Sequence, residues 1–311
     1  PFGLGVIDSD EFLNEIAEIG IIFLLFLIGL DLQPSKLKNM LGESLLTALG
    51  TSIIFFSLSA GIMLIAGFNY FEAIVTGLGM TFSSTILAVK LLPTTALHHR
   101  HIGEMVISLL LIQDLLAIFA IILVGALGAQ AASLSTNLLA LGLGLPGLIL
   151  GAYLAVRFIL LPLISKFDAF HEYIFLLTIA WCLLGSSAAH AIGLSYEIGA
   201  FIAGVSLATS PIAQYIAEHL KPLRDFFLIL FFFTVGASLN LGLLQQVWLP
   251  ALLLAATMLA VKPKVFESLL KVQGEPAAAS KEVGWRLGQA SEFSLLLSYI
   301  ALANGVISPL A

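Results

Sequence analysis

The sequence predicts an all-α membrane protein, and three observations lead to this fold class. Hydrophobic residues make up 59% of the 311 residues and charged residues 10%, against roughly 25% charged residues in soluble domains. Mean hydropathy is +1.07. The apolar residues form long runs between Pro, Gly and polar clusters, as membrane-spanning helices do, and the sequence lacks the short alternating segments that predict a membrane barrel.

The apolar runs predict about ten helical segments. These segments cover residues 12–30, 42–66, 71–92, 104–127, 138–164, 172–193, 195–208, 224–239, 247–270 and 284–305. The segment at 195–208 is too short to cross a bilayer at about 1.5 Å per residue, so we expect it to be extended by its flanks or tilted beside a loop. Cys182, the single cysteine, lies inside an apolar run, which excludes an intramolecular disulfide.

Basic residues lie in or beside every second connection between these segments. The thirteen are Lys36, Lys38, Lys90, Arg100, Arg157, Lys166, Lys221, Arg224, Lys262, Lys264, Lys271, Lys281 and Arg286. The connections between those sets carry none: 67–71, 128–137, 193–195 and 240–246. The positive-inside rule therefore predicts a multi-pass protein of the inner or plasma membrane with its basic loops in the cytoplasm. The net charge of −6 gives no indication of a nucleic-acid partner.

Asp114 is the only ionisable residue in the apolar stretch 105–129, and it lies near the middle of that stretch, directly after Gln113. A carboxylate at this depth costs several kcal/mol, so it is expected to face an ion or proton pathway rather than lipid. The alternative is a protonated Asp that hydrogen-bonds a neighbouring helix, although Ser, Thr and Asn usually have that role. The sequence therefore predicts a cation or proton site at Asp114.

Two stretches of the chain are similar to each other and are predicted to run in opposite directions. Leu24–Leu37 reads LLFLIGLDLQPSKL, and Phe231–Leu244 reads FFFTVGASLNLGLL. They match at Phe26/Phe233, Gly29/Gly236, Leu32/Leu239 and Leu37/Leu244. Such matches between apolar helices are weak by themselves, but opposite orientation is typical of inverted-repeat secondary transporters, whose sites lie near the midplane between discontinuous helices.

Two of the predicted segments contain candidate interruptions. Segment 71–92 places glycines and hydroxyl side chains in mid-membrane. The hydroxyl residues are Thr81, Ser83, Ser84 and Thr85. Backbone groups freed by a break there can coordinate a cation or bond those hydroxyls, although small residues also serve close helix contact. In segment 247–270, Pro263 removes a donor and clashes with the preceding turn, so Lys262-Pro263 predicts a second interruption; alternatively, Lys262 snorkels to the inner membrane boundary.

Several segments together resemble the monovalent cation:proton antiporter-2 family, most closely its Kef-type branch of potassium:proton exchangers. The matching stretches are LLFLIGLDLQPSKL (24–37), SST (83–85), LLIQDLLAI (110–118), GLSYEIGAFIAGVSLA (193–208), FFFTVGASLNL (231–241) and LGQASEFSLLL (287–297). The resemblance implies an inverted-repeat sodium/proton-antiporter-like fold, in which a core domain with two crossing discontinuous helices moves against a dimerisation domain. It also implies a homodimer.

The same resemblance implies site residues. Asp114 carries the ion and the proton alternately, with Gln113 beside it. Because electrogenic relatives have two consecutive acids at this point, Gln113 implies electroneutral exchange of one cation for one proton. The hydroxyl residues at 81–85 fall on the first discontinuous helix, and Lys262 falls on the second. The chain is expected to be one transmembrane exchanger domain, 1–311, with the family's first helix and its C-terminal regulatory domain missing.

The predicted chemistry is competition between a cation and a proton for one carboxylate. Desolvation opposes the charged form of Asp114, whereas a bound cation and hydrogen bonds favour it. Carboxylate, hydroxyl and amide oxygens suit a hard monovalent cation, K⁺ by the resemblance or Na⁺, and argue against a transition metal; no cofactor is expected. Glu292 is the other deeply placed acid, and we expect a structural ion pair with Arg286 or Lys262 rather than a transport role.

Two other classes of protein remain to be weighed. A passive cation channel, or a ligand-gated K⁺ efflux pathway, usually has a filter of repeated carbonyl loops or charged rings, and the sequence shows no such repeat. An intramembrane aspartyl protease needs two acids that share a proton. Asp31 is predicted at the inner boundary and Asp114 at mid-depth, which disfavours that pairing. We therefore expect a transporter and not an enzyme.

Overall fold

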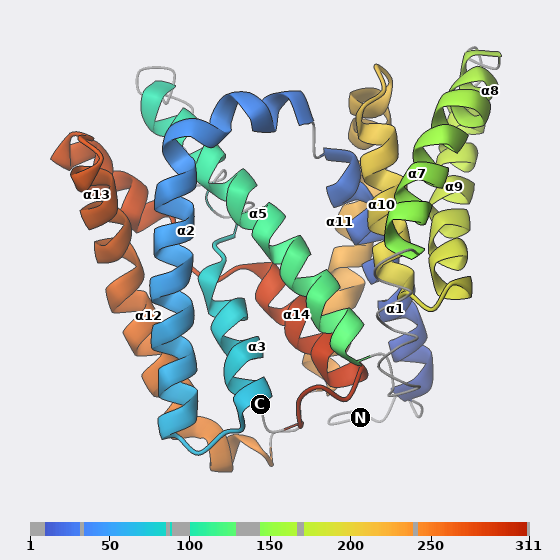
Figure 1. Ribbon diagram of the computed structural model, residues 1–311. Coiled ribbons are helices and arrows are strands. Elements are labelled where there is room, and N and C mark those ends of the chain that lie inside the picture. Colours follow the sequence, from blue (N-terminus) through green and yellow to red (C-terminus); the bar gives the residue numbers. More distant parts are fainter. Residues whose placement is uncertain are drawn as a thin grey trace. The chain divides into compact units, whose positions relative to one another are not determined.

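The computed structural model describes residues 10–31, 34–84, 88, 100–128, 144–166, 171–238 and 242–309. Within these ranges every regular element is a helix, which confirms the all-α prediction (Figure 1). The chain divides into two compact units. Unit 1 comprises Pro1–Ser35 and Ala129–Leu239, and unit 2 comprises Lys36–Gly128 and Asn240–Ala311.

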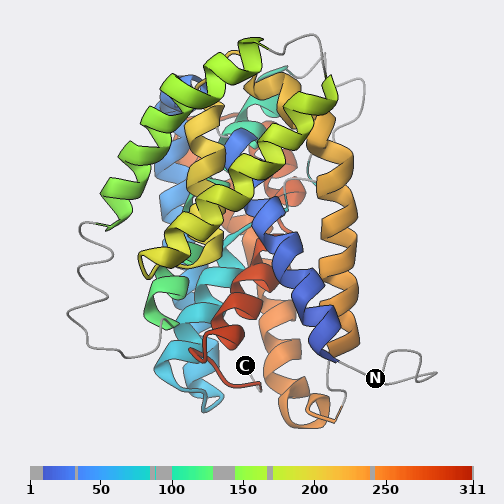
Figure 2. The same cartoon turned by 90° about the vertical axis from the view of Figure 1, so that its right-hand side faces the viewer.

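Unit 1 is a bundle in which α1 packs against α10 and α11 (Figure 2). Its helices are α1 (Asp10–Asp31), α7 (Leu145–Ala155), the π-helical η3 (Val156–Leu160), α8 (Leu161–Lys166), α9 (His171–Ala191), α10 (Tyr196–Ala208) and α11 (Ala213–Ser238). Glycines let α1 and α10 approach closely: a Cβ on Gly204 would lie 2.1 Å from the Phe26 oxygen, and one on Gly29 would lie 2.5 Å from the Phe201 oxygen.

Helix α11 begins eleven residues earlier than the predicted segment 224–239, because residues 213–223 are amphipathic rather than uniformly apolar. Ile216 and Leu220 are buried in the unit 1 core, whereas His219 and Lys221 are exposed. A criterion that requires continuous apolar runs misses such an amphipathic start of a helix.

Unit 2 consists of nearly all of α2 (Pro34–Ile65) together with α3 (Tyr70–Thr81), α5 (Arg100–Gly128), α12 (Leu244–Val272), α13 (Ala277–Arg286) and α14 (Glu292–Ala303). Helix α5 packs against α3, α13 and α14. Its buried residues Val106, Leu109 and Leu110 share a core with Phe55 of α2 and Phe266 of α12.

Five stretches of the described helices are long and apolar enough to cross a membrane. They are Ser44–Ile65, Met105–Gly125, Leu145–Lys166, Glu172–Ala191 and Gln245–Val272. Helix α10 has only 13 residues, in agreement with the short segment predicted at 195–208. These spans confirm a multi-pass membrane protein.

The second interruption lies at a different place from the predicted one. Helix α12 continues through Lys262 and Pro263, whereas the predicted single helix at 284–305 is divided, with α13 ending at Arg286 and α14 beginning at Glu292. Pro263 is accommodated because two glycines, one in α13 and one just after it, face it. A Cβ on Gly284 would lie 2.3 Å from the Pro263 oxygen, and one on Gly288 would lie 2.8 Å from its ring.

Replacing Gly284 by Ala is expected to destabilise unit 2 by about 1–3 kcal/mol, because the added methyl group must push α13 away from the backbone of α12. Gly61→Ala is the matched control, since a Cβ on Gly61 of α2 meets no atom within 4 Å. Thermal unfolding of both variants in detergent measures the difference. Equal midpoints for Gly284→Ala and wild type would contradict this account of the α12–α13 contact.

Candidate ion-binding site

The first predicted interruption is present in the structure. Helix α3 ends at Thr81, and Phe82 is extended, with φ −86° and ψ 151°. The chain is helical again at Ala88, whose N–H donates to the Ser84 oxygen over 3.1 Å. Phe82, Ser83 and Ser84 are all buried, so the backbone groups of these residues that lack helical bonds need other partners.

Gln113 of α5 supplies partners on both sides of this break. Its Oε1 accepts from the Ser83 N–H over 3.1 Å, and its Nε2 donates to the Thr81 oxygen over 3.4 Å. The side chain is fully buried. An amide suits this position because it carries a donor and an acceptor at once, which a carboxylate lacks. Gln113 therefore holds the extended segment against α5.

The second break faces the first. Ser83 Oγ donates to the Leu287 oxygen over 2.7 Å, and Gln289 Nε2 donates to the Ser84 oxygen over 3.2 Å. One helical turn away, Ser294 Oγ of α14 donates to the Gly79 oxygen of α3 over 2.5 Å. Figure 1 shows α3 and α14 side by side next to α5. Two discontinuous helices thus meet at their unwound residues, as the fold class requires.

Lys262 joins the two breaks. Its Nζ donates to the Phe82 oxygen over 2.8 Å and to the Gln289 oxygen over 3.0 Å, and it lies 5.4 Å from the centre of the Phe55 ring. The side chain is 2% exposed. Phe82 caps the C-terminal end of α3, and Gln289 follows the C-terminal end of α13, so the ammonium lies where both half-helices carry partial negative charge.

Asp114 follows Gln113 on α5 and lies within the membrane span Met105–Gly125, where it is partly exposed. Successive residues of a helix point about 100° apart, so Gln113 faces the break while Asp114 faces a neighbouring direction. This places an intramembrane carboxylate one residue from the amide that holds the extended segment. Oxygen donors of this kind suit a hard cation or a proton.

The predicted site residues are brought together in large part. Thr81, Ser83, Ser84, Gln113 and Lys262 lie around the facing breaks, whereas Thr85 is outside the described residues. Thr81 Oγ1 donates to the Leu78 oxygen over 2.6 Å, within its own helix. Lys262 belongs to this cluster from the continuous helix α12 and not from a discontinuous one.

The predicted ion pair of Glu292 with Arg286 or Lys262 stays a prediction. Arg286 pairs with Glu282, one turn earlier in α13, at 2.6 Å, and Lys262 donates to backbone oxygens. Glu292 is the first residue of α14, next to the capping Ser291, and a carboxylate there is favoured by the helix dipole.

Gln289 and Leu287 were missed as members of the cluster. The signal was present in the sequence: Gly288-Gln289-Ala290-Ser291 is a small, polar run between two apolar stretches, and Ser291 is a good N-cap followed by an acid. The Lys-Pro pair in α12 is the stronger local signal for a break, so the sequence placed the second break there rather than between α13 and α14.

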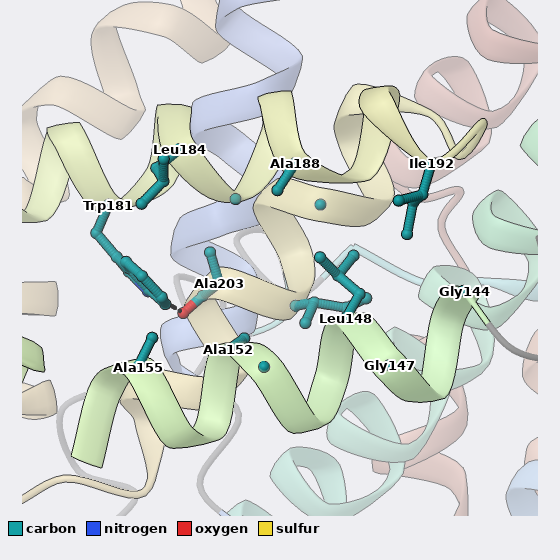
Figure 3. Close-up of a pocket in the computed structure, with 14 residues that line it drawn as sticks. Gly144, Gly147, Leu148, Ala152, Ala155, Trp181, Leu184, Ala188, Ile192 and Ala203 are labelled. Atoms are coloured by element: carbon teal, nitrogen blue, oxygen red, sulfur yellow. Dashed lines mark hydrogen bonds between the residues drawn. The ribbon is translucent and has the colours of Figure 1, made fainter. Parts of the chain in front are cut away.

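Unit 1 contains an apolar pocket of about 520 Å³ between α7, α9 and α10 (Figure 3). Leu148 and Ala152 line it from α7, Leu184 lines it from α9, and Ile192 lines it from the turn directly after α9. The one polar side chain of the lining, Trp181, donates its indole N–H to the Ala203 oxygen over 3.1 Å. Among these lining residues no side chain carries an oxygen that a hard cation would prefer.

A multi-spanning helical protein, in which two discontinuous helices meet at buried extended residues beside an intramembrane carboxylate, belongs to the class of secondary transporters. The particular family is shown by comparison with known proteins. The family described as sodium/hydrogen exchanger, transmembrane, matches residues 1–310, and the chain belongs to this family. Its members exchange monovalent cations for protons across membranes, so the protein is a cation:proton antiporter.

Proposed function

We propose that this protein exchanges K⁺ for H⁺ electroneutrally, with Asp114 as the group that carries each in turn. One observation supports this most directly: Gln113, the neighbour of Asp114, is an amide with its donor and its acceptor both used by the first break. Relatives with two consecutive acids place a second titrating group at this point. Here the position before Asp114 holds the amide Gln113, which binds the backbone of the first break, so only one carboxylate is left to titrate.

The cycle follows from competition at Asp114. An ionised carboxylate in the membrane is stabilised by a bound cation, and protonation removes that attraction and releases the cation. The cation and the proton carry the same charge and cross the membrane in opposite directions. A complete alternating-access cycle therefore moves no net charge.

Hydroxyl groups are suited to complete the cation shell. Ser83 and Thr81 each donate their hydroxyl proton to a backbone oxygen, Leu287 and Leu78 respectively. A hydroxyl that donates its proton keeps its lone pairs, which are then available to a cation. Together with Ser84 they form the proposed oxygen ligands of the cation held by Asp114, and Thr85, outside the described residues, is a further candidate from the sequence.

Lys262 has an auxiliary role in this proposal. Its Nζ donates to the Phe82 and Gln289 oxygens and so joins the two breaks at the crossing. These two oxygens are therefore not cation ligands. Glu292 and Arg286 are likewise assigned no transport role.

The remaining features of the proposal come from the sequence. The Kef-type resemblance supports K⁺ over Na⁺ and a homodimer, and the distribution of basic residues supports cytoplasmic basic loops, within one transmembrane exchanger domain. The inverted repeat between 24–37 and 231–244 stays a prediction.

Exchange by the wild-type protein is expected to carry no steady current, because the cation and the proton carry the same charge in opposite directions. If one net charge moved per cycle, the rate would instead depend on voltage at about 2.3 kcal/mol per 100 mV. The test records dye-reported pH change and solid-supported-membrane current from the same proteoliposomes, with K⁺, Na⁺ and Li⁺ compared side by side. Liposomes with Asp114→Asn protein measure the leak.

A steady current that scales with the pH change would show that a second group, such as Lys262 or Glu292, titrates in the cycle. A current without any proton gradient would identify a channel instead. A larger pH response to Na⁺ than to K⁺ would overturn the assigned cation and leave the exchange mechanism in place.

A further inference from the structure

At the end of α3 remote from the break lies a buried carboxylate that the proposed exchange cycle does not use. Glu72 is the third residue of α3 and forms a capping box with Asn69: Asn69 Oδ1 accepts from the Glu72 N–H over 3.0 Å, and the Asn69 N–H donates to Glu72 Oε2 over 2.9 Å. The side chain is 6% exposed. A cap alone needs only this one oxygen.

The second carboxylate oxygen bonds a distant part of the chain. Glu72 Oε1 accepts from the Ser308 N–H over 3.3 Å and from Ser308 Oγ over 2.5 Å. Ser308 follows α14, the second half of the other discontinuous helix. The start of α3 is thus tied to the end of α14, while their opposite ends are joined by Ser83–Leu287 and Ser294–Gly79. Glu72 is the only charged group among these ties.

Glu72 is the only charged residue in the part of this end of unit 2 that the structure describes. The described stretches that lead away from the breaks toward this end are 44–81, 115–128, 242–261 and 293–309, and among their residues Glu72 is the only Asp, Glu, Lys, Arg or His. Tyr70 and Tyr299 are the only other titratable side chains. The contact therefore depends on one carboxylate and on hydrogen-bond donors.

These contacts favour the ionised form. Two of the three partners of Glu72 are backbone N–H groups, which only donate, and the third is the Ser308 hydroxyl, which can also accept. A proton on Oε2 would point at the Asn69 N–H, and a proton on Oε1 would compete with the Ser308 N–H even if the hydroxyl turned to accept it. The tie between α3 and Ser308 is consequently strongest at neutral pH and is weakened when acidification protonates Glu72.

We propose that Glu72 is a positioning residue for exchange: its ionised carboxylate locks α3 to the segment after α14, keeps the two breaks aligned, and slows exchange when it is protonated. This inference rests on the proposed function. Because the connection 67–71 carries no basic residue, the positive-inside rule places Glu72 at the outer face, so the acidity of the outer solution would control the lock.

The first test is hydrogen exchange by mass spectrometry on the purified full chain, with rates corrected for intrinsic pH dependence. In wild type, protection of residues 304–309 is expected to fall on acidification. In Glu72→Gln, a neutral side chain of the same size, it is expected to be low at every pH. Glu267→Gln is the matched control, because it neutralises a carboxylate of the same unit that pairs at the surface with Lys271.

The second test is exchange in proteoliposomes as a function of outer pH. Glu72→Gln is expected to be roughly tenfold slower than wild type at neutral pH, from the loss of hydrogen bonds to a charged acceptor. Its acid limb is expected to be shallower than that of wild type, because only the proton competition at Asp114 remains. Asn69→Ala removes the cap but keeps the Ser308 contacts, so it should retain the wild-type pH profile. If the effect of Glu72→Gln came only from the lost helix cap, Asn69→Ala would instead show the same rate and pH profile as Glu72→Gln.

The two measurements separate the possible failures. If wild type shows no exchange at any pH, the proposed function fails, and the lock is judged by hydrogen exchange alone. If Glu72→Gln keeps the wild-type protection and pH profile, the lock is overturned. Should Glu72→Gln fail to fold, Ser308→Ala removes one of the three bonds, and unchanged protection of 304–309 in that variant overturns the proposal.

Discussion

Replacing Asp114 by Asn is expected to reduce cation-coupled proton flux to the level of protein-free liposomes. Asn has the size of Asp and keeps hydrogen-bonding capacity, but it does not titrate and does not balance the charge of a cation. Both halves of the proposed cycle need the carboxylate, one to hold the proton and one to hold the cation, so no partial activity should remain. The measurement is dye-reported pH change on addition of K⁺ or Na⁺ to proteoliposomes.

The matched control is Glu267→Gln, which neutralises a carboxylate of the same unit that pairs with Lys271 outside the candidate site. It should exchange as wild type does. Thermal midpoints of all three proteins should agree closely, because Asn has the size of Asp and keeps hydrogen-bonding capacity at position 114. Retained coupled flux in folded Asp114→Asn protein would mean that another group carries the proton.

The sequence predicted the class of fold and the first break because both depend on local signals. Glycines and hydroxyls in the middle of an apolar run at 77–85 have few explanations in a membrane, and the helix does end at Thr81. The motif at 110–118 likewise pointed to Gln113 and Asp114 before any contact was known. These features are properties of single segments.

The second break could not be located in this way, because what decides it is contact between segments. Pro263 is tolerated inside α12 since Gly284 and Gly288 come from another helix to accommodate it. The partners of Lys262 are equally remote, since Phe82 lies 180 positions earlier and Gln289 lies 27 positions later. A single sequence gives no measure of such pairings, so Lys262 was placed near the site but on the wrong kind of helix.

Lys262→Met is expected to lower both stability and exchange strongly. Methionine fills a similar volume but leaves the buried Phe82 oxygen and the partly buried Gln289 oxygen without the ammonium, at about 1–3 kcal/mol for a buried unsatisfied group. Part of this loss is offset because a charge no longer has to be buried. We expect the lost bonds to outweigh that gain, since the same oxygens lie where the two half-helices carry partial negative charge.

Lys264→Met is the matched control, because Lys264 lies two residues further along α12 and is exposed. Thermal unfolding and proteoliposome exchange of both variants separate the role of the position from the loss of any lysine. Lys262→Arg keeps the charge and should recover stability in part, although the larger planar guanidinium does not fit as a compact ammonium does. If Lys262→Met unfolds at the wild-type midpoint and exchanges at the wild-type rate, the two breaks are held together without the ammonium, and the Ser83–Leu287 and Gln289–Ser84 hydrogen bonds alone must hold the crossing.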